Sequence, residues 1–252
     1  MSRGNVATLG GLVAAAVLGV SLPACAQPLL RNITPFGESN GPGNPPVARY
    51  VAGPGVSFIF DRSEAAPEAL FRLDGSPEVW VLQPSPAPRG DTIWRNDVGE
   101  PVLRVTRLGG VTLYTPRTPE GMPVALLGDA EDLQLPPFIP PDAFLLRGVQ
   151  SAYRAAQAAG HKIEFSTPRQ VPLPWTAQFT DAFTVTADAI VRLGRDRKAK
   201  EFLAKLEAVH FIAGSKPDVT FNGPVMTITL VPTKGFAGRP SSDRIAKVAL
   251  KH

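Results

Sequence analysis

Three carboxylates near the middle of the chain have the residue type and spacing that acid–base chemistry requires. Asp91, Asp97 and Glu100 gather around one expected hairpin. Two carboxylates that flank a groove can hydrolyse a glycosidic bond, because one stays protonated as the acid while the other is ionised. The same residue types are common in turns, where their side chains accept hydrogen bonds from the local backbone. Both interpretations stay open.

A basic segment offers a second kind of chemistry. Six Lys and Arg residues fall within residues 192–205, against Asp196 and Glu201. Such a segment can attract a phosphate-bearing lipid, lipopolysaccharide or an acidic protein by screened Coulomb forces. It is also typical of an ordinary solvated helix face. The tentative anion-binding residues of this segment are Arg195, Arg197, Lys198 and Lys200.

A glycine-rich loop, residues 235–243, leads into an expected C-terminal helix and contains Arg239, Ser241 and Ser242. Free N–H groups at a helix N-terminus can hold an anion together with an arginine and hydroxyl groups. We therefore add these three residues to the tentative anion-binding set. Asp243 would itself supply the negative charge that a helix N-terminus prefers, so a loop followed by an N-cap also explains the pattern.

Other catalytic or cofactor chemistry has little support. The sequence has no Gly-x-Ser-x-Gly, His-Glu-x-x-His or P-loop motif, and no Gly-x-Gly-x-x-Gly after a strand. One cysteine and three histidines disfavour a metal centre. His161 and His210 could serve as bases, yet both lie at expected helix ends, where histidine interacts favourably with the helix dipole. We expect no catalytic residue, no cofactor and no metal.

The N-terminus resembles a secretory signal peptide. Arg3 provides the positive charge, residues 9–22 are apolar or small, and residues 24–26 match a small-x-small cleavage site. Cleavage between Ala26 and Gln27 predicts a periplasmic or secreted protein. A bacterial lipobox ending at Cys25 is the alternative and would give a lipid-anchored protein. No later segment has the ~20 apolar residues of a transmembrane helix.

Composition divides the rest of the chain. The 252 residues, 44% of them apolar, suit one globular domain or two small ones. Residues 28–141 hold 19 of the 27 prolines and carry a formal charge of −4, whereas residues 142–252 hold all eight lysines and carry +7. The predicted organisation is a signal peptide, a disordered Pro/Gly-rich lead-in, an antiparallel β subdomain and a basic α+β subdomain, over residues 1–26, 27–55, 56–135 and 136–252.

Short apolar segments separated by turn residues predict six strands in the first half, at 56–60, 69–73, 78–82, 92–95, 102–107 and 111–114. Because these strands follow one another with short turns between them, they indicate an antiparallel meander or small barrel. In the second half the apolar period lengthens and predicts four helices, with a strand and a hairpin between them. The helices are expected at 142–159, 179–193, 199–209 and 242–250, the strand at 161–166 and the hairpin at 219–231. The fold class is therefore α+β, with a helix-rich second half that contains a β-hairpin.

The apolar stripe of the first helix predicts the face that the fold buries, and it consists of Phe144, Leu145, Val149, Ala152, Tyr153, Ala156 and Ala159. Asp142 is the expected N-cap of this helix, and Gly160 follows its C-terminal end. Ser241 is the expected N-cap of the last helix.

The segments GDTIWRNDVG (90–99), LRVT (103–106), GGVTLY (109–114) and AGRPSS (237–242) resemble an uncharacterised family of exported bacterial proteins, a domain of unknown function. The resemblance implies export and carries no activity or site residue. We expect a non-enzymatic binding or interaction module of the envelope, with an anionic envelope component or an acidic protein as partner. Nucleic acid is disfavoured by the predicted compartment. A secreted hydrolase of cell-wall glycan or ester, using Asp91, Asp97, Glu100 or a histidine, is the alternative.

Overall fold

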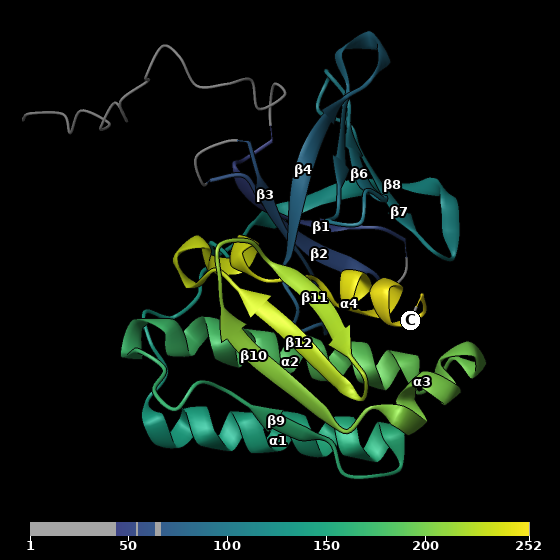
Figure 1. Ribbon diagram of the computed structural model, residues 1–252. Coiled ribbons are helices and arrows are strands. Elements are labelled where there is room, and N and C mark those ends of the chain that lie inside the picture. Colours follow the sequence, from purple (N-terminus) through teal and green to yellow (C-terminus); the bar gives the residue numbers. More distant parts are fainter. Residues whose placement is uncertain (1–43, 54, 64–66, 252) are drawn as a thin grey trace, which may run out of the picture. The chain divides into compact units, whose positions relative to one another are not determined.

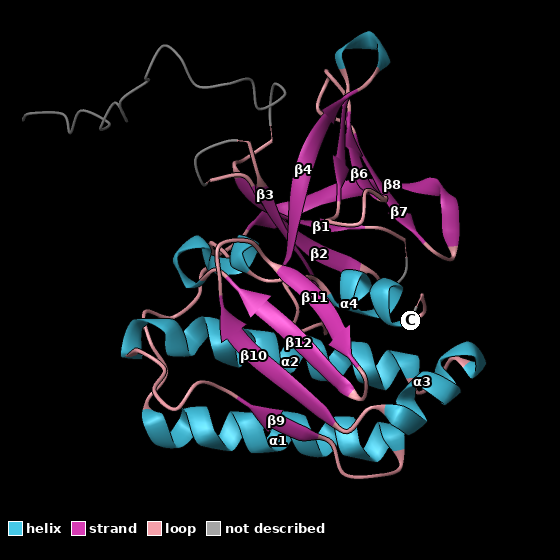
Figure 2. Cartoon of the chain, viewed as in Figure 1, coloured by secondary structure: helices cyan, strands magenta, loops and turns pink. Residues whose placement is uncertain are grey.

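The computed structural model describes residues 44–53, 55–63 and 67–251, all within one compact unit. The predicted signal peptide, its cleavage site at Ala26 and Gln27, Cys25, and the lead-in up to residue 43 lie outside the described residues. Strands occupy the first half of the described chain and mixed helices and strands the second (Figures 1 and 2). The predicted α+β class is therefore confirmed.

The first half is a closed barrel of eight antiparallel strands. Its strands are β1 (Val47–Val51), β2 (Ser57–Asp61), β3 (Ala69–Leu73), β4 (Trp80–Pro86), β5 (Thr92–Arg95), β6 (Pro101–Val105), β7 (Val111–Thr115) and β8 (Thr118–Asp129). A short 3₁₀ turn, η1 (Pro88–Gly90), joins β4 to β5. The barrel closes because β1 pairs with both β2 and β8. The small-barrel alternative is thus the right one, and an open meander is wrong.

Two of the eight strands were not predicted. β1 lies in the segment expected to be a disordered lead-in, and β8 follows the last expected strand. Tyr50 and Ala48 of β1 are buried in the barrel core, which orders a strand inside a segment rich in Pro and Gly. In β8, Pro119, Gly121 and Pro123 conceal the strand in the sequence, because all are unfavourable within strands.

The barrel interior is filled by aromatic side chains. Tyr50, Phe58 and Phe71 are buried, with ring centroids 5.4 Å apart for Tyr50–Phe58 and 5.0 Å for Phe58–Phe71. Such contacts add to the free energy gained by removing the rings from water. A smaller cluster lies outside this core, where Leu133 of the segment after β8 packs against Ile59 and Leu70.

The second half is a four-stranded sheet in the order β11-β12-β10-β9. Its strands are β9 (Glu164–Ser166), β10 (Ala208–Ala213), β11 (Asp218–Asn222) and β12 (Val225–Leu230). β11 and β12 form the predicted antiparallel hairpin, whereas β10 pairs in parallel with both β9 and β12. The long helices α1 (Pro141–Ala159) and α2 (Thr176–Leu193) lie on one face of the sheet (Figure 1). The remaining elements are η2 (Leu173–Trp175), η3 (Arg197–Ala199), α3 (Lys200–Lys205), η4 (Pro232–Gly238) and α4 (Ser242–Ala249).

The predicted third helix is wrong beyond Lys205. Leu206 has extended backbone angles and ends α3. The following residues form β10, in which Val209 and Phe211 are buried and His210 is exposed. This alternation is that of a strand with one covered face, and pairing with two neighbouring strands stabilises it over the helix that the local sequence favours.

The ends of the other helices partly match the predictions. Gly160 follows α1 with a φ of 80°, a left-handed conformation that favours glycine, so the C-terminal signal is confirmed. The N-cap of α1 is Pro140 rather than Asp142, which lies in the first turn. Ser241 is the N-cap of α4, as predicted, and its Oγ accepts a hydrogen bond from the N–H of Arg244.

Helix α1 buries only part of the predicted stripe: Phe144 and Ala159 pack against the core of the second half, and the ring of Phe144 lies 5.4 Å from that of Phe183 between centroids. The buried residues of α1 are Ser151 and Ala155, whereas Leu145, Val149 and Tyr153 are 67%, 67% and 64% exposed. The smaller side chains face α2, where the helices pack closely. These three residues of the predicted stripe therefore form an exposed apolar face. Among the residues described, no helix combines the length and the apolar character needed to cross a bilayer.

Candidate functional site

Arg239, a predicted anion-binding residue, is buried where the barrel meets the second half. Its side chain is 2% exposed, and its Nε donates to the carboxylate of Asp181. Its Nη2 donates to the carbonyl oxygen of Val79 at 2.9 Å, and its Nη1 lies 3.6 Å from a carboxylate oxygen of Glu78. Arg239 therefore binds two carboxylates and a carbonyl group of its own chain.

Ser241 and Ser242 also hold carboxylates of the barrel half. The backbone N–H of Ser241 donates to Asp97 at 2.9 Å and its hydroxyl at 2.5 Å. The backbone N–H of Ser242 donates to Glu78 at 2.8 Å and its hydroxyl at 2.5 Å. The first turn of α4 thus binds two anionic groups at its N-terminus, the end that favours negative charge. An external anion at these residues stays a prediction, and it would have to displace Asp97 or Glu78.

Burial and pairing shift the ionisation of this cluster. Burial raises the pKa of Glu78 above its ordinary value, and Arg239 and the two donors of Ser242 offset only part of the effect. Burial opposes the charge of Arg239, but Asp181 and Glu78 outweigh it and raise the pKa of its guanidinium. The cluster thus joins the two halves through buried charge-assisted hydrogen bonds.

Sequence reasoning missed Glu78 and Asp181. Glu78 lies 164 residues before Ser242, and Asp181 lies 58 residues before Arg239. Glu78 stands at the start of an expected strand, and Asp181 stands within an expected helix. No local pattern marks either carboxylate, so only the fold reveals that they share one cation.

Two of the three predicted acid–base carboxylates are held by other residues of the chain. Asp91 and Asp97 flank opposite ends of β5, and each has a separate structural contact. Asp91 is 7% exposed and accepts a hydrogen bond from Arg104 Nε at 2.8 Å. Asp97 accepts the two hydrogen bonds from Ser241. Glu100 is exposed near the β5–β6 turn, where its backbone N–H donates to Asn96.

Asp91 should stabilise the fold only while it is ionised. The hydrogen bond from Arg104 lowers the pKa of Asp91, and the N–H of Arg107 adds to this effect. A carboxyl whose folded pKa is lowered contributes stability above its unfolded pKa, about 3.9, and the contribution is lost as pH falls through the folded value. We expect Asp91→Asn to lower the melting temperature at pH 7 and to lower it less at pH 3. An equal difference at both values would contradict this role.

The structure describes two of the histidines, His161 and His210. His161 Nε2 lies 2.8 Å from the carbonyl oxygen of Leu206, which ties the end of α1 to the segment before β10. His210 lies on the exposed side of β10. Within the part of the chain that the structure describes, no group of three or more His, Cys, Asp or Glu side chains could hold a metal ion.

The four predicted cations before and in α3 are exposed. The side chains of Arg195, Arg197, Lys198 and Lys200 have no hydrogen bond or ion pair with any other described residue. Asp196 lies among them, but its carboxylate accepts the backbone N–H of Lys198 at 2.9 Å and so caps η3. We call these four residues the cation cluster. The two outer cations of the segment are paired, Lys205 with Glu201 at 2.8 Å and Arg192 with Asp243 at 2.7 Å.

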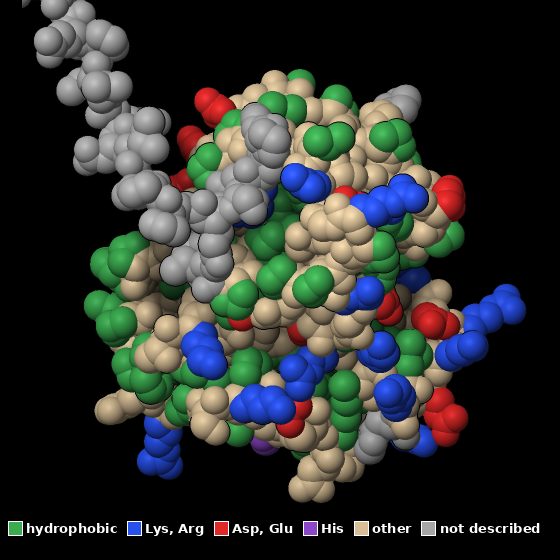
Figure 3. All heavy atoms as spheres, turned by 90° about the horizontal axis from the view of Figure 1, so that it is seen from above, with side chains coloured by type: hydrophobic (Ala, Val, Ile, Leu, Met, Phe, Trp, Pro, Cys, Tyr) green, Lys and Arg blue, Asp and Glu red, His purple; other side chains and the backbone are tan. Residues whose placement is uncertain are grey.

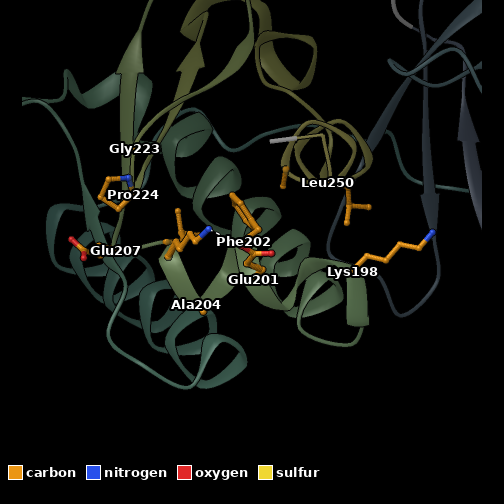
Figure 4. Close-up of a pocket in the computed structure, with 11 residues that line it drawn as sticks. Lys198, Glu201, Phe202, Ala204, Glu207, Gly223, Pro224 and Leu250 are labelled. Carbon is orange, nitrogen blue, oxygen red and sulfur yellow. Dashed lines mark hydrogen bonds and ion pairs between the residues drawn. The ribbon is translucent and has the colours of Figure 1, made fainter.

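A cavity of about 670 Å³ adjoins the cation cluster. Phe202, Pro224, Ala249 and Leu250 give it an apolar lining, and Lys198 lies at its edge with the amino group directed away from the other labelled residues (Figure 4). On the face drawn in Figure 3, basic side chains lie among apolar, uncharged and acidic ones. The charged residues that line the cavity are Lys198, Lys205, Glu201 and Glu207, so the formal charge of the cavity itself is zero, and the positive charge lies beside it in the cation cluster.

The family of the chain follows from its sequence as a whole. A family model described as "Domain of unknown function (DUF4908)" matches residues 30–249. The chain belongs to this family. Its match extends over the barrel, the sheet and the helices, so the DUF4908 fold includes both halves. No curated protein and no solved structure matches the chain.

Proposed function

We propose that this DUF4908 protein is an exported, envelope-associated binding module that holds an anionic partner without catalysis. The observation that carries the proposal is the cation cluster, in which four exposed cations lie within residues 195–200 and have no partner among the described residues. Like charges repel one another, so an anionic partner that binds there relieves repulsion as well as adding attraction. The signal-peptide pattern supports export to the envelope.

The cavity beside the cluster adds apolar contact to this electrostatic attraction. An anionic envelope component with an apolar portion would place its charge at the cluster and its apolar portion against Phe202 and Leu250. Charge would then accelerate association and apolar burial would slow dissociation. An acidic protein is the second partner class that the same charge favours.

The hydrolase alternative has less support. A general acid must carry a proton at the working pH, whereas the lowered pKa of Asp91 keeps this carboxyl ionised. Asp97 is committed to the N-terminus of α4, and Glu100 is exposed. These contacts favour structural roles for the carboxylates near β5.

Charge reversal of the cluster tests the proposal. The fourfold variant R195E/R197E/K198E/K200E should reduce binding to host envelope fractions at least tenfold at low salt. Binding by the unmodified protein should weaken as salt rises, because the cluster is exposed and therefore screened. Co-sedimentation of purified protein with the envelope fraction measures both effects.

The matched control reverses four exposed cations from other parts of the surface, R147E/R169E/K216E/K234E. The two variants have the same net charge, so only the position of the cations differs. Binding that survives in the cluster variant, or that falls equally in both variants, would contradict the proposed site.

A further inference from the structure

A second cavity, of about 490 Å³, opens at one end of the barrel. Its lining comes from the neighbouring ends of β3 and β4, of β5 and β6, and of β7 and β8, with the β5–β6 and β7–β8 turns, and Arg192 of α2 and Asp243 of α4 complete it. Mouths of β-barrels are frequent ligand sites, and this volume is within the range of cavities that enclose small molecules.

The inner part of this cavity is apolar and aromatic. Phe71, Val102 and Leu113 are buried in the barrel core, and their side chains line the cavity. Trp80 and Tyr114 are half-buried there, and the rings of Trp80 and Phe71 lie 5.8 Å apart between centroids. The cavity therefore presents aromatic surface that an apolar molecule would remove from water.

The charges around the cavity differ from those of the cation cluster. Arg192 is paired with Asp243, and Asp243 also accepts a hydrogen bond from Asn96 at 3.1 Å. The carboxylate of Glu100 has no hydrogen bond or ion pair with any described residue. One cation and two carboxylates line the cavity, so its formal charge is −1. This charge favours a cationic ligand and disfavours an anionic one.

We propose that the barrel-mouth cavity binds a small organic cation with an aromatic or aliphatic body. The body contacts Phe71, Trp80 and Leu113, and the ammonium group faces Glu100. Aromatic rings also attract a cation through their negative faces. This site is independent of the cation cluster, because it takes a ligand of opposite charge and shares no residue with it.

Three probes with one bicyclic body and different charges test the proposal. They are 1-naphthylmethylamine, 1-naphthalenemethanol and 1-naphthoate, each titrated into the intact protein by calorimetry at pH 7. We expect the amine to bind most tightly and the carboxylate most weakly. Binding of none of the three, or tightest binding of naphthoate, would overturn the proposal.

Two variants identify the site within the protein. Glu100→Gln should weaken binding of the amine roughly five- to tenfold and leave the affinity for the alcohol unchanged, since the substitution removes only the charge of the carboxylate. Glu131→Gln removes an exposed carboxylate outside this cavity, so it should change the affinity for neither the amine nor the alcohol. Equal amine affinity in the Glu100→Gln variant and the unmodified protein would overturn the assignment. The fourfold cluster variant should bind the amine normally, which separates this site from the proposed function.

Discussion

Arg239→Met is expected to lower the free energy of unfolding by about 3–5 kcal/mol, as for other buried ion pairs that lose one partner. The substitution removes the guanidinium that Asp181 and Glu78 share and leaves both carboxylates near the junction of the halves without it. The carbonyl of Val79 loses its donor as well. Urea unfolding followed by circular dichroism measures the difference.

Arg244→Met is the control for this experiment. Arg244 follows Arg239 in the same segment, and its Nη2 lies 3.0 Å from Asp218, but both side chains are partly exposed. Water already solvates such a pair, so its loss should cost at most about 1 kcal/mol. Similar losses in the two variants would show that burial of the Arg239 cluster adds no stability.

Gly238→Ala should destabilise the protein by about 3 kcal/mol, at the upper end of the range for overpacked sites. A methyl group at this position would collide with the backbone oxygen of Val231 and with the side-chain nitrogen of Gln178. The backbone there has little freedom to move, because the N–H of Val231 donates to the carbonyl of Gly238 at 2.7 Å. The midpoint of thermal unfolding measures the loss.

Gly148→Ala is the control for Gly238→Ala, because here an added methyl group should stabilise the protein. A methyl group on this residue of α1 would lie 3.5 Å from the ring of Phe183, an ordinary contact distance. Alanine is the better helix former by roughly 0.5–1 kcal/mol, so this variant should be more stable than the unmodified protein. Destabilisation by Gly148→Ala comparable to that by Gly238→Ala would contradict the steric explanation.

Most of the barrel could be predicted because local turn chemistry separates its strands. Asp74 and Gly75 mark the turn between β3 and β4, and both of these strands were expected. β1 and β8 could not be predicted, because the pairing that closes the barrel orders them and joins residues far apart in the chain. Likewise, how much of α1 is covered depends on how closely α2 approaches it, so the apolar pattern alone placed the exposed Leu145, Val149 and Tyr153 on the buried face together with Phe144, which does pack against the core.

The candidate sites likewise combine local features that the sequence predicts with long-range contacts that only the fold reveals. The exposed cation cluster and the capping role of Ser241 are local features, and both were predicted from neighbouring residues. The carboxylates that Arg239, Ser241 and Ser242 bind come from distant parts of the chain, so their roles depend on the fold. The barrel-mouth cavity is likewise formed by the ends of several barrel strands and by two helices. No single segment of the sequence could reveal it.

The contacts of α4 also bear on the order in which the protein matures. Ser242 follows Glu78 by 164 residues, so it emerges after the barrel strands whether the chain folds on the ribosome or as it leaves an export channel. During that interval a newly formed barrel holds Glu78 and Asp97 without the hydrogen-bond donors that later bind them. We expect the nascent barrel to be a loose intermediate that becomes rigid only when the final helix docks. Synthesis that stops short of residue 239 would therefore yield a chain whose barrel stays susceptible to proteases.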